Sequence, residues 1–580
     1  MAVAPQGSQP AYGIKAERDV LASMRDGTRL AVDVYRPDAP GRFPALLSMH
    51  PYSKDIEDTI RLGEKLQRMT AEFSSVEAGD HEFWARHGYV HVIADVRGTG
   101  KSEGAYFGLF SPQEQRDGYD LVEWVAAQDW CDTNVGMCGI SYLGVIQYLV
   151  AAQQPPHLKA IFPHDAWGDT YRDIFYHGGI PSVFGFILAS AIALHHGAPV
   201  SRSLYGEEEL VQRVEALLSD EATSFAKNPT AIRTLRLPDV YPISFDVLFN
   251  REDGPFWRER SPMQHMHNIQ VPTYLGSELH KQPTMMHVPG VSWGWDRIPA
   301  PKKVAFRPCN LGGLDRPFYE FHDEMLRWFD HWLKGIDTGI MDEPAVKIWV
   351  RGREVWRYAD EWPLLSVTSW TRVYLRSEGR LTTEPPPEAE EDSVKLRYEP
   401  AMPVVLNPVP LSPKPEYLSY TTAPFERGVE VIGPIALHLQ AALSAEDGDF
   451  IAVVKDVDLD GSECVLTRGW LRASHRALDP ETSTDWRPFH PHTNCSPINR
   501  GERYEFAIEI RPIANFFKRG HCLKLEIWPC DFPNEPGNDW TLNWGKGQHI
   551  PYGKAVTYEI FHTPQAPSYL VMPVIREGGP

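Results

Sequence analysis

The feature that most constrains the fold of this chain is the stretch of residues 135–152, VGMCGISYLGVIQYLVAA. A short apolar run typical of a buried strand leads into a turn with Gly139, Ser141 and Gly144, and a helix-length apolar segment follows. Glycines around a serine between a strand and a helix allow a tight turn that exposes the hydroxyl and directs the next backbone N–H toward a developing oxyanion. The spacing is one residue longer than the usual Gly-x-Ser-x-Gly. On its own, the pattern fits a buried serine in a tight turn equally well.

The flanking segments predict an α/β fold. Alternating residues around Asp26-Gly27 indicate a β-hairpin over residues 20–35. Buried strands are predicted at residues 44–49, 88–94, 158–162, 271–276 and 302–308, and helices at residues 113–127 and 321–335. Strands that alternate with helices favour a mostly parallel sheet covered on both faces, and ligands bind such sheets outside the carboxyl ends of their strands. The turn at Ser141 lies at that edge.

The chain is long enough for several domains. Residues 1–168 and 264–351 are expected to form the two parts of the α/β domain, and the helical stretch 169–263 an inserted cap over Ser141. A Pro- and acid-rich segment at residues 384–416 reads as a linker or long surface loop. Short alternating runs dominate residues 352–580, which predicts an all-β jelly-roll domain.

Composition narrows the classes of partner. The formal net charge of −20 over 580 residues argues against binding to nucleic acid or to an anionic membrane, because a phosphate-binding surface must be basic. We find no apolar run long enough for a transmembrane helix and no secretory signal pattern. The seven cysteines are scattered without Cys-x-x-Cys spacing, as expected of reduced thiols in a cytoplasmic protein. A small-molecule substrate is expected, and a homo-oligomer stays open.

Several motifs in order along the chain resemble the cocaine esterase-like α/β-hydrolases, a group that includes α-amino-acid ester hydrolases and X-prolyl dipeptidyl peptidases. They are RDGTRLAVDVYRP (residues 25–37), HPYSKD (50–55), DVRGTGKSEG (95–104), GYDLVEWVAAQDW (118–130), GISYLG (139–144), YRDIFYHGG (171–179), RWFDHWLKG (327–335) and GWLRASHRALD (469–479). The resemblance covers nearly the whole chain. It implies a hydrolase domain, a helical cap and a C-terminal jelly roll, in agreement with the division above.

The resemblance also implies roles for three residues. Ser141 matches the nucleophile of the family's Gly-x-Ser-Tyr-x-Gly motif, and the backbone N–H of Tyr142 matches one oxyanion donor. Tyr52 matches the tyrosine whose hydroxyl is the second donor. Donors aimed at a developing oxyanion supply several kcal/mol of transition-state stabilisation. A core tyrosine packed beside Pro51 is the alternative for Tyr52.

The remaining members of a catalytic triad depart from the family pattern. An Asp is expected after the strand that follows the cap, but Glu278 is the carboxylate there. The next strand should be followed by the histidine, yet residues 307–318, RPCNLGGLDRPF, contain none. Because a serine without a base is a weak nucleophile, we expect His287 to supply it, with Glu278 as the orienting acid. His280 and His322 are the alternatives.

No cofactor is expected. The glycine-rich residues 95–104 follow no phosphate-loop pattern, and the histidines at 195–196 and 490–492 lack further ligands at metal spacing. The aspartates at 447, 449, 456 and 458 alternate along strands and form no EF-hand loop.

The expected function is therefore that of a serine hydrolase. It would cleave an ester or amide bond through an acyl-enzyme, and Trp167, Phe175, Tyr176 and Phe184 would favour a small aromatic or acyl-amino substrate. An X-prolyl dipeptidyl peptidase is one alternative. A degenerate, non-catalytic hydrolase fold that binds a ligand is another, and carbohydrate binding by the β-domain is a third that rests on fold analogy alone.

Overall fold

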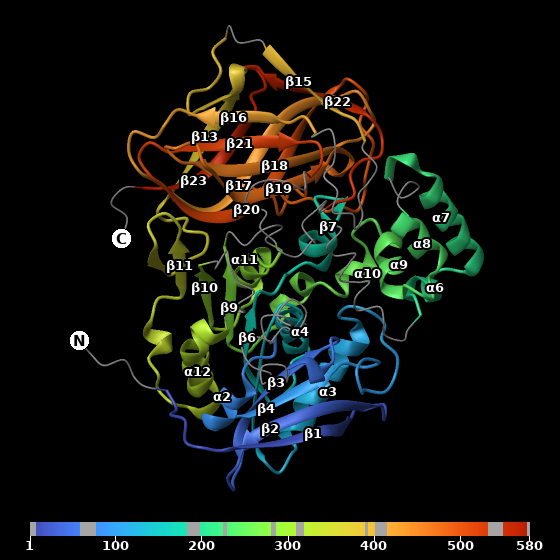
Figure 1. Cartoon of the computed structure of the whole chain (residues 1–580), viewed down its shortest axis with the longest axis vertical. Coiled ribbons are helices and arrows are strands. Elements are labelled where there is room, and N and C mark those ends of the chain that lie inside the picture. Colours follow the sequence, from blue (N-terminus) through green and yellow to red (C-terminus); the bar gives the residue numbers. More distant parts are fainter. Residues whose placement is uncertain are drawn as a thin grey trace.

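The first sheet forms the lower part of the molecule in Figure 1. The structure is a computed structural model, and it describes residues 7–57, 77–182, 198–223, 229–279, 286–308, 318–388, 392–400, 415–531 and 549–576. Among these residues the sheet has ten strands, in the order β1-β2-β4-β3-β5-β6-β9-β10-β11-β12. Their bounds are β1 Ile14–Ser23, β2 Arg29–Pro37, β3 Phe43–His50, β4 Val90–Asp95, β5 Cys131–Ile140, β6 Leu158–His164, β9 Thr273–Glu278, β10 Lys302–Arg307, β11 Val346–Val350 and β12 Val355–Ala359. Strands β4, β3, β5, β6, β9, β10 and β11 are parallel to one another, as the alternation of strands and helices predicts.

Two layers of helices bury this sheet. Helices α2 (His81–Arg86) and α12 (Phe318–Lys334) pack on one face, and α3 (Pro112–Ala126), α4 (Tyr142–Ala151) and α11 (Val288–Arg297) pack on the other. The central strands β4 and β9 are buried along their whole length, because helices cover both of their faces. The α/β-hydrolase architecture expected from the sequence is confirmed.

The edges of the sheet are antiparallel. Strands β1 and β2 form the predicted hairpin, in which Gly27 has a φ of 85°. At the other edge β12 pairs with β11, so this sheet extends to Ala359, beyond the expected domain boundary at residue 351. Strand β12, VWRYA, is half-exposed and mixes apolar with polar residues, and for this reason its sequence resembles the runs of the β-domain.

Residues 169–263 are mainly helical in their described parts. A π-helical turn (Tyr171–Phe175) and a short β7–β8 hairpin (Tyr176–His177, Ile180–Pro181) precede α6 (Val200–Leu204), α7 (Glu207–Ser219), α8 (Pro229–Arg236), α9 (Pro242–Phe249) and α10 (Pro255–Arg258). Helices α6 to α9 lie at one side of the molecule, at the right of Figure 1. Whether this insertion covers Ser141 stays a prediction, because residues 183–197, with Phe184 among them, lie outside the described residues.

The C-terminal part is all-β, as predicted, and its strands form one sheet that closes on itself as a barrel, whereas the jelly-roll topology stays a prediction. The strands are β13 Thr368–Arg376, β14 Arg380–Thr382, β15 Asp392–Tyr398, β16 Leu418–Thr422, β17 Val429–Leu443, β18 Asp449–Val457, β19 Glu463–Arg472, β20 Arg503–Phe517, β21 Cys522–Trp528, β22 Val556–His562 and β23 Tyr569–Ile575. Pairing of β17 with β23 closes the sheet around an apolar core.

The β-domain lies directly on the α/β domain (Figure 1) and bonds to it through the backbone. The N–H of Arg351 donates to Ala514 O at 3.0 Å, and the N–H of Phe516 donates to Arg351 O at 2.8 Å. The N–H of Arg472 donates to Gly178 O at 2.9 Å. Backbone hydrogen bonds therefore connect the two domains close to the carboxyl edge of the first sheet.

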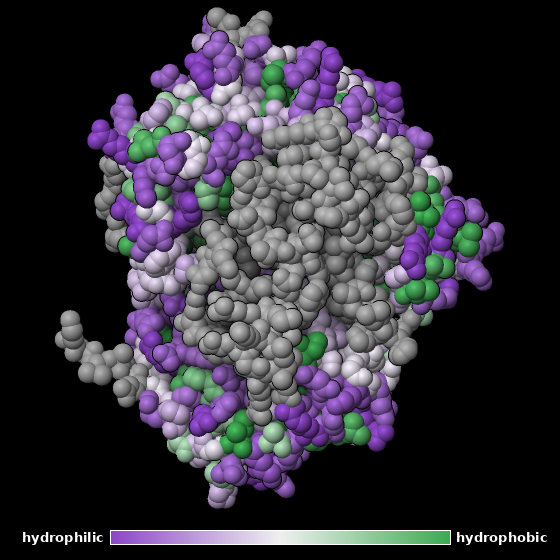
Figure 2. Space-filling view, viewed as in Figure 1, coloured by the Kyte–Doolittle hydropathy of each residue, from purple (hydrophilic) through white to green (hydrophobic). Residues whose placement is uncertain are grey.

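Polar side chains dominate the described surface in Figure 2, and the exposed apolar residues there are scattered among them. Of the helices in the described ranges, none combines the length and the apolar character that crossing a membrane requires.

Candidate active site

The turn between β5 and α4 has the geometry of a nucleophile elbow. Ser141 has φ 58° and ψ −115°, a conformation that non-glycine residues rarely adopt outside a strained functional turn. A Cβ on Gly139 would lie 2.4 Å from Leu143 Cβ, and a Cβ on Gly144 would lie 2.7 Å from His164 O. Gly139 therefore permits the turn itself, whereas Gly144 lets α4 approach the end of β6. This division of roles explains the long Gly-x-Ser-x-x-Gly spacing.

Backbone hydrogen bonds hold the elbow in place. The N–H of Ser141 donates to His164 O at 3.1 Å, and the N–H of Ile140 donates to Glu77 O at 3.0 Å. The carbonyl of Ser141 accepts from the N–H groups of Gly144 and Val145 at 3.0 and 2.9 Å. The strained residue is thus fixed on both sides, which keeps its hydroxyl in one position.

The structure brings Ser141 and His287 together. Ser141 Oγ and His287 Nε2 are 3.3 Å apart, within hydrogen-bond distance. His287 is the residue immediately before α11, and its ring is near-parallel to the indole of Trp167, with centroids 6.1 Å apart and an interplanar angle of 22°. The imidazole approaches the elbow from the connection between β9 and β10, one strand earlier than the family pattern predicts.

The alternative histidines are placed differently. The ring of His322, in α12, stacks on Phe83 of α2 with centroids 4.3 Å apart, on the face of the sheet opposite α4. Burial lowers the pKa of His322 from its ordinary value of 6.5. His280 lies outside the described residues.

Two buried carboxylates end neighbouring strands beside the elbow. Glu278 is the last residue of β9, and its N–H donates to Asp165 Oδ1 at 3.3 Å. Asp165 directly follows β6, has a φ of 45°, and also accepts from Ser277 Oγ at 2.9 Å. Sequence reasoning missed Asp165, although its position directly after a buried strand was a usable signal. The role of Glu278 as the orienting acid stays a prediction.

The two tyrosines of the expected oxyanion hole are neighbours. The rings of Tyr52, just after β3, and Tyr142 meet edge to face with centroids 5.8 Å apart. Tyr142 is the first residue of α4, and the first N–H groups of a helix have no acceptor within the helix. The backbone of Tyr142 therefore presents a donor next to Ser141, with Tyr52 nearby.

The phenol of Tyr142 points into the protein interior. Its hydroxyl donates to Glu114 Oε1 at 2.6 Å, lies 3.0 Å from the hydroxyl of Tyr106, and accepts from the N–H of Phe110 at 3.4 Å. Burial raises the pKa of Glu114 to about 8. These bonds anchor Tyr142 beneath the elbow. Nothing in the sequence distinguishes Glu114 from the many other acidic residues in amphipathic helices.

Of the aromatic residues expected near the substrate, Trp167 lies at the site. Phe175 and Tyr176 are buried against Trp257, with ring centroids 5.2 and 6.0 Å from that ring, so they contribute to packing within the insertion. Phe110 stacks on Tyr142 at 4.2 Å and meets Trp167 edge to face at 5.6 Å, which makes it a second aromatic neighbour of the elbow.

The described residues contain no group of three or more His, Cys, Asp or Glu side chains arranged to hold a metal ion. His490 and His492, which the sequence analysis weighed as ligands, have structural partners. His490 is bonded to the carbonyls of Ala477 and Ala507, and His492 Nδ1 lies 2.9 Å from His475 Nδ1.

Fold and elbow together define an α/β-hydrolase of the serine type. Residues 26–309 match the family described as X-Pro dipeptidyl-peptidase (S15 family), and residues 338–571 match the X-Pro dipeptidyl-peptidase C-terminal non-catalytic domain. The chain belongs to this family, and its relatives include a cocaine esterase and putative Xaa-Pro dipeptidyl-peptidases. It is a serine hydrolase that cleaves ester or amide bonds.

Individual relatives agree with this assignment. The chain is 29% identical to a cocaine esterase of Rhodococcus sp. (strain MB1 Bresler), over 96% of this chain and 98% of that protein. It is 24% identical to a putative Xaa-Pro dipeptidyl-peptidase of Bacillus anthracis, over 88% of this chain and 82% of the relative.

Solved structures show the same fold. A CocE/NonD family hydrolase from Staphylococcus aureus superposes with a TM-score of 0.76 at 22% identity, covering 97% of this chain and 94% of the other. An α-amino acid ester hydrolase gives a TM-score of 0.72 at 19% identity, covering 98% of both chains.

Proposed function

We propose that the protein hydrolyses a small ester by acyl transfer to Ser141, with His287 as the general base. The observation that carries this proposal is the 3.3 Å separation of Ser141 Oγ and His287 Nε2 at the strained elbow. In the tautomer with its proton on Nδ1, the imidazole accepts the serine proton at Nε2 as Oγ attacks the carbonyl carbon.

The tetrahedral intermediate carries its negative charge on the former carbonyl oxygen. The N–H of Tyr142 and the hydroxyl of Tyr52 donate to this oxyanion. His287 then returns the proton to the leaving group, and the acyl-enzyme remains. Water repeats the sequence with the same base and releases the acid.

Glu278 is the orienting acid in this proposal. A carboxylate that accepts from Nδ1–H would hold the imidazole in the required tautomer and stabilise its charged form. The position of Glu278 at the carboxyl end of β9, nine residues before His287, supports this role. Asp165, on the neighbouring strand end, is the competing candidate.

Trp167 and Phe110, beside the elbow, favour an aromatic acyl or acyl-amino group in the substrate. The net charge of −20 argues against nucleic acid as a partner. We place the protein in the cytoplasm because seven scattered cysteines suit a reducing compartment, and a homo-oligomer is compatible with this function.

Turnover of p-nitrophenyl acyl esters tests the proposal. Purified protein should release p-nitrophenol, phenylacetyl esters should react faster than acetyl esters, and the Ser141→Ala variant should be inactive. Equal turnover by wild type and Ser141→Ala would contradict the proposal.

An X-Pro dipeptidyl-peptidase activity is the second candidate, supported by the family descriptions and by the Bacillus anthracis relative. The more extensive match to cocaine esterase favours the ester. A dipeptide Xaa-Pro-p-nitroanilide, assayed beside the phenylacetyl ester, separates the two. Higher kcat/KM for the anilide, lost on acetylation of its N-terminus, would show that the peptidase is the main activity.

A further inference from the structure

His287 directly precedes the N-terminal end of helix α11, and one side of this helix packs against the α/β domain. A Cβ on Gly290, in its first turn, would lie 1.8 Å from Ala166 O, so the helix backbone is in direct contact with the segment that follows β6. The side chain of Trp293 also contacts this segment, because a Cβ on Gly168 would lie 2.6 Å from its ring. These contacts fix how near α11 lies to the elbow, but they leave its outer side uncovered.

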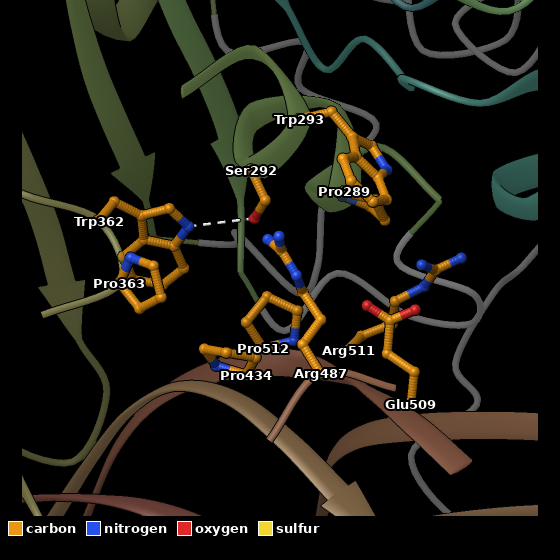
Figure 3. Close-up of a pocket in the computed structure, with 10 residues that line it drawn as sticks. All are labelled: Pro289, Ser292, Trp293, Trp362, Pro363, Pro434, Arg487, Glu509, Arg511 and Pro512. Atoms are coloured by element: carbon orange, nitrogen blue, oxygen red, sulfur yellow. Dashed lines mark hydrogen bonds between the residues drawn. The ribbon is translucent and has the colours of Figure 1, made fainter. Parts of the chain in front are cut away.

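A segment of the β-domain between β19 and β20 covers that outer side. Arg487 Nη1 bonds to Asp296 Oδ2, in the last turn of α11, at 2.7 Å. The guanidinium of Arg487 also lies 5.1 Å from the centre of the Trp293 ring. Phe489 meets the same ring edge to face, with centroids 5.7 Å apart. Figure 3 shows Arg487 extending toward α11 from the side of the β-domain.

The segment that joins the two domains, between β12 and β13, also contacts α11. The indole N–H of Trp362 donates to Ser292 Oγ at 3.0 Å, the bond drawn in Figure 3. The cavity left between α11 and the β-domain has a volume of about 20 Å³, space for roughly one water molecule. The helix is therefore in contact with both domains.

We propose that Arg487 is a positioning residue, through which the β-domain holds α11 and so fixes His287 against Ser141. The inference rests on the proposed function of these two residues. A ten-residue α-helix is about 15 Å long, so we infer that release of its last turn at Asp296 lets the helix tilt on its contact with Ala166 and displaces the imidazole at its N-terminal end. A misplacement of about 1 Å at a catalytic group costs up to about 10²-fold in rate.

The test compares kcat per active site, titrated with a fluorophosphonate probe, in Arg487→Ala and Arg487→Lys. Both acylation and deacylation use His287, so kcat reports on its position whichever step limits the rate. We expect Arg487→Ala to lower kcat by about 10- to 10²-fold with KM within twofold of wild type, and Arg487→Lys to recover part of the loss. Asp296→Asn should have the same effect, and the double variant should be no worse than Arg487→Ala.

Arg353→Ala is the matched control. Arg353 also crosses the domain interface, where it bonds to Glu430 at 2.7 Å and lies 4.0 Å from the Phe516 ring centre, but it belongs to the turn between β11 and β12. Its kcat per titrated site should equal that of wild type. This variant separates general docking of the β-domain from the specific hold on α11.

Three results would overturn the inference. They are an unchanged kcat per site in Arg487→Ala, an equal loss of kcat in Arg353→Ala, and additive losses from Arg487→Ala and Asp296→Asn. A fall only in the number of titratable sites belongs to the first case and means that Arg487 serves stability alone. Failure of the proposed function is a separate result, because wild type itself would then take up no probe at Ser141.

Discussion

The two halves of the proposed catalytic pair are built in different ways. The strained conformation of Ser141 is set within six consecutive residues, since the glycines, the positive φ and the start of α4 all belong to the same turn, and hydrogen bonds to His164 and Glu77 hold that turn in place. His287 depends on distant parts of the chain: Ala166 on one side of α11, and Arg487 and Trp362 on the other. The elbow is a local device, whereas the base is held by tertiary packing.

The largest expected effect tests whether the two halves act as one unit. Ser141→Ala and His287→Ala should each lower kcat by up to about 10⁶-fold, and the double variant should be no slower, because neither residue works without the other. Steady-state hydrolysis of the p-nitrophenyl ester measures this. His322→Ala is the control and should keep wild-type kcat. Additive losses would mean that Ser141 and His287 act independently.

Substitution of the orienting acid tests the histidine half of the proposed catalytic pair. Glu278→Gln should lower kcat by about 10⁴-fold, because an amide in place of the carboxylate favours the wrong tautomer of the imidazole. Asp165→Asn is the matched variant and should leave kcat within tenfold of wild type. The reverse pattern in the same assay would assign the role to Asp165.

Removal of an oxyanion donor tests the serine half of the proposed catalytic pair. Tyr52→Phe removes one hydroxyl and should lower kcat by about 10²- to 10³-fold with little change in KM. Tyr106→Phe, in the network beneath the elbow, serves as the control and should change kcat by far less. An equal loss in both variants would show that Tyr52 acts through packing.

The smallest effect concerns stability. The folded protein keeps a proton on Glu114 up to about pH 8, whereas the unfolded chain releases it near the ordinary value of 4.5. The contribution of this group is therefore complete below pH 4.5 and is lost as the pH rises to about 8, with a slope of at most about 1.4 kcal/mol per pH unit. Glu114→Gln should flatten the fall of the unfolding temperature over this range.

Differential scanning calorimetry from pH 4.5 to 9 measures that dependence. Glu207→Gln, on the exposed helix α7, is the control and should follow wild type. If Glu114→Gln also followed wild type, the proton on Glu114 would not contribute to stability.

The features that could be predicted from the sequence are those set by short stretches of chain, and the features that were missed depend on tertiary packing. The elbow, the hairpin around Gly27 and the strands covered on both faces are encoded in short stretches, and all three were predicted. The membership of β12 in the first sheet was missed because this half-exposed edge strand mixes apolar with polar residues, as strands of the β-domain do. Glu114 was missed because its importance comes from burial and from partners distant in sequence, whereas Asp165 was missed although it directly follows a buried strand.

The choice among the histidines shows the limit most clearly. His287 was favoured because its segment follows the strand after the insertion, β9. The structure places His287 Nε2 3.3 Å from Ser141 Oγ. Yet nothing in residues 278–290 encodes the contact between Gly290 and Ala166 or the bond from Arg487 that locates α11. Its catalytic role stays a prediction until it is measured.

The most direct measurement is the rate and site of fluorophosphonate labelling, followed by intact mass and peptide mapping. The account predicts one adduct, on the peptide that contains Ser141. It also predicts labelling slower by about 10²- to 10⁴-fold in His287→Ala and unchanged in His322→Ala. An adduct on another residue, or wild-type labelling of Ser141 in His287→Ala, would contradict the pairing of Ser141 with His287.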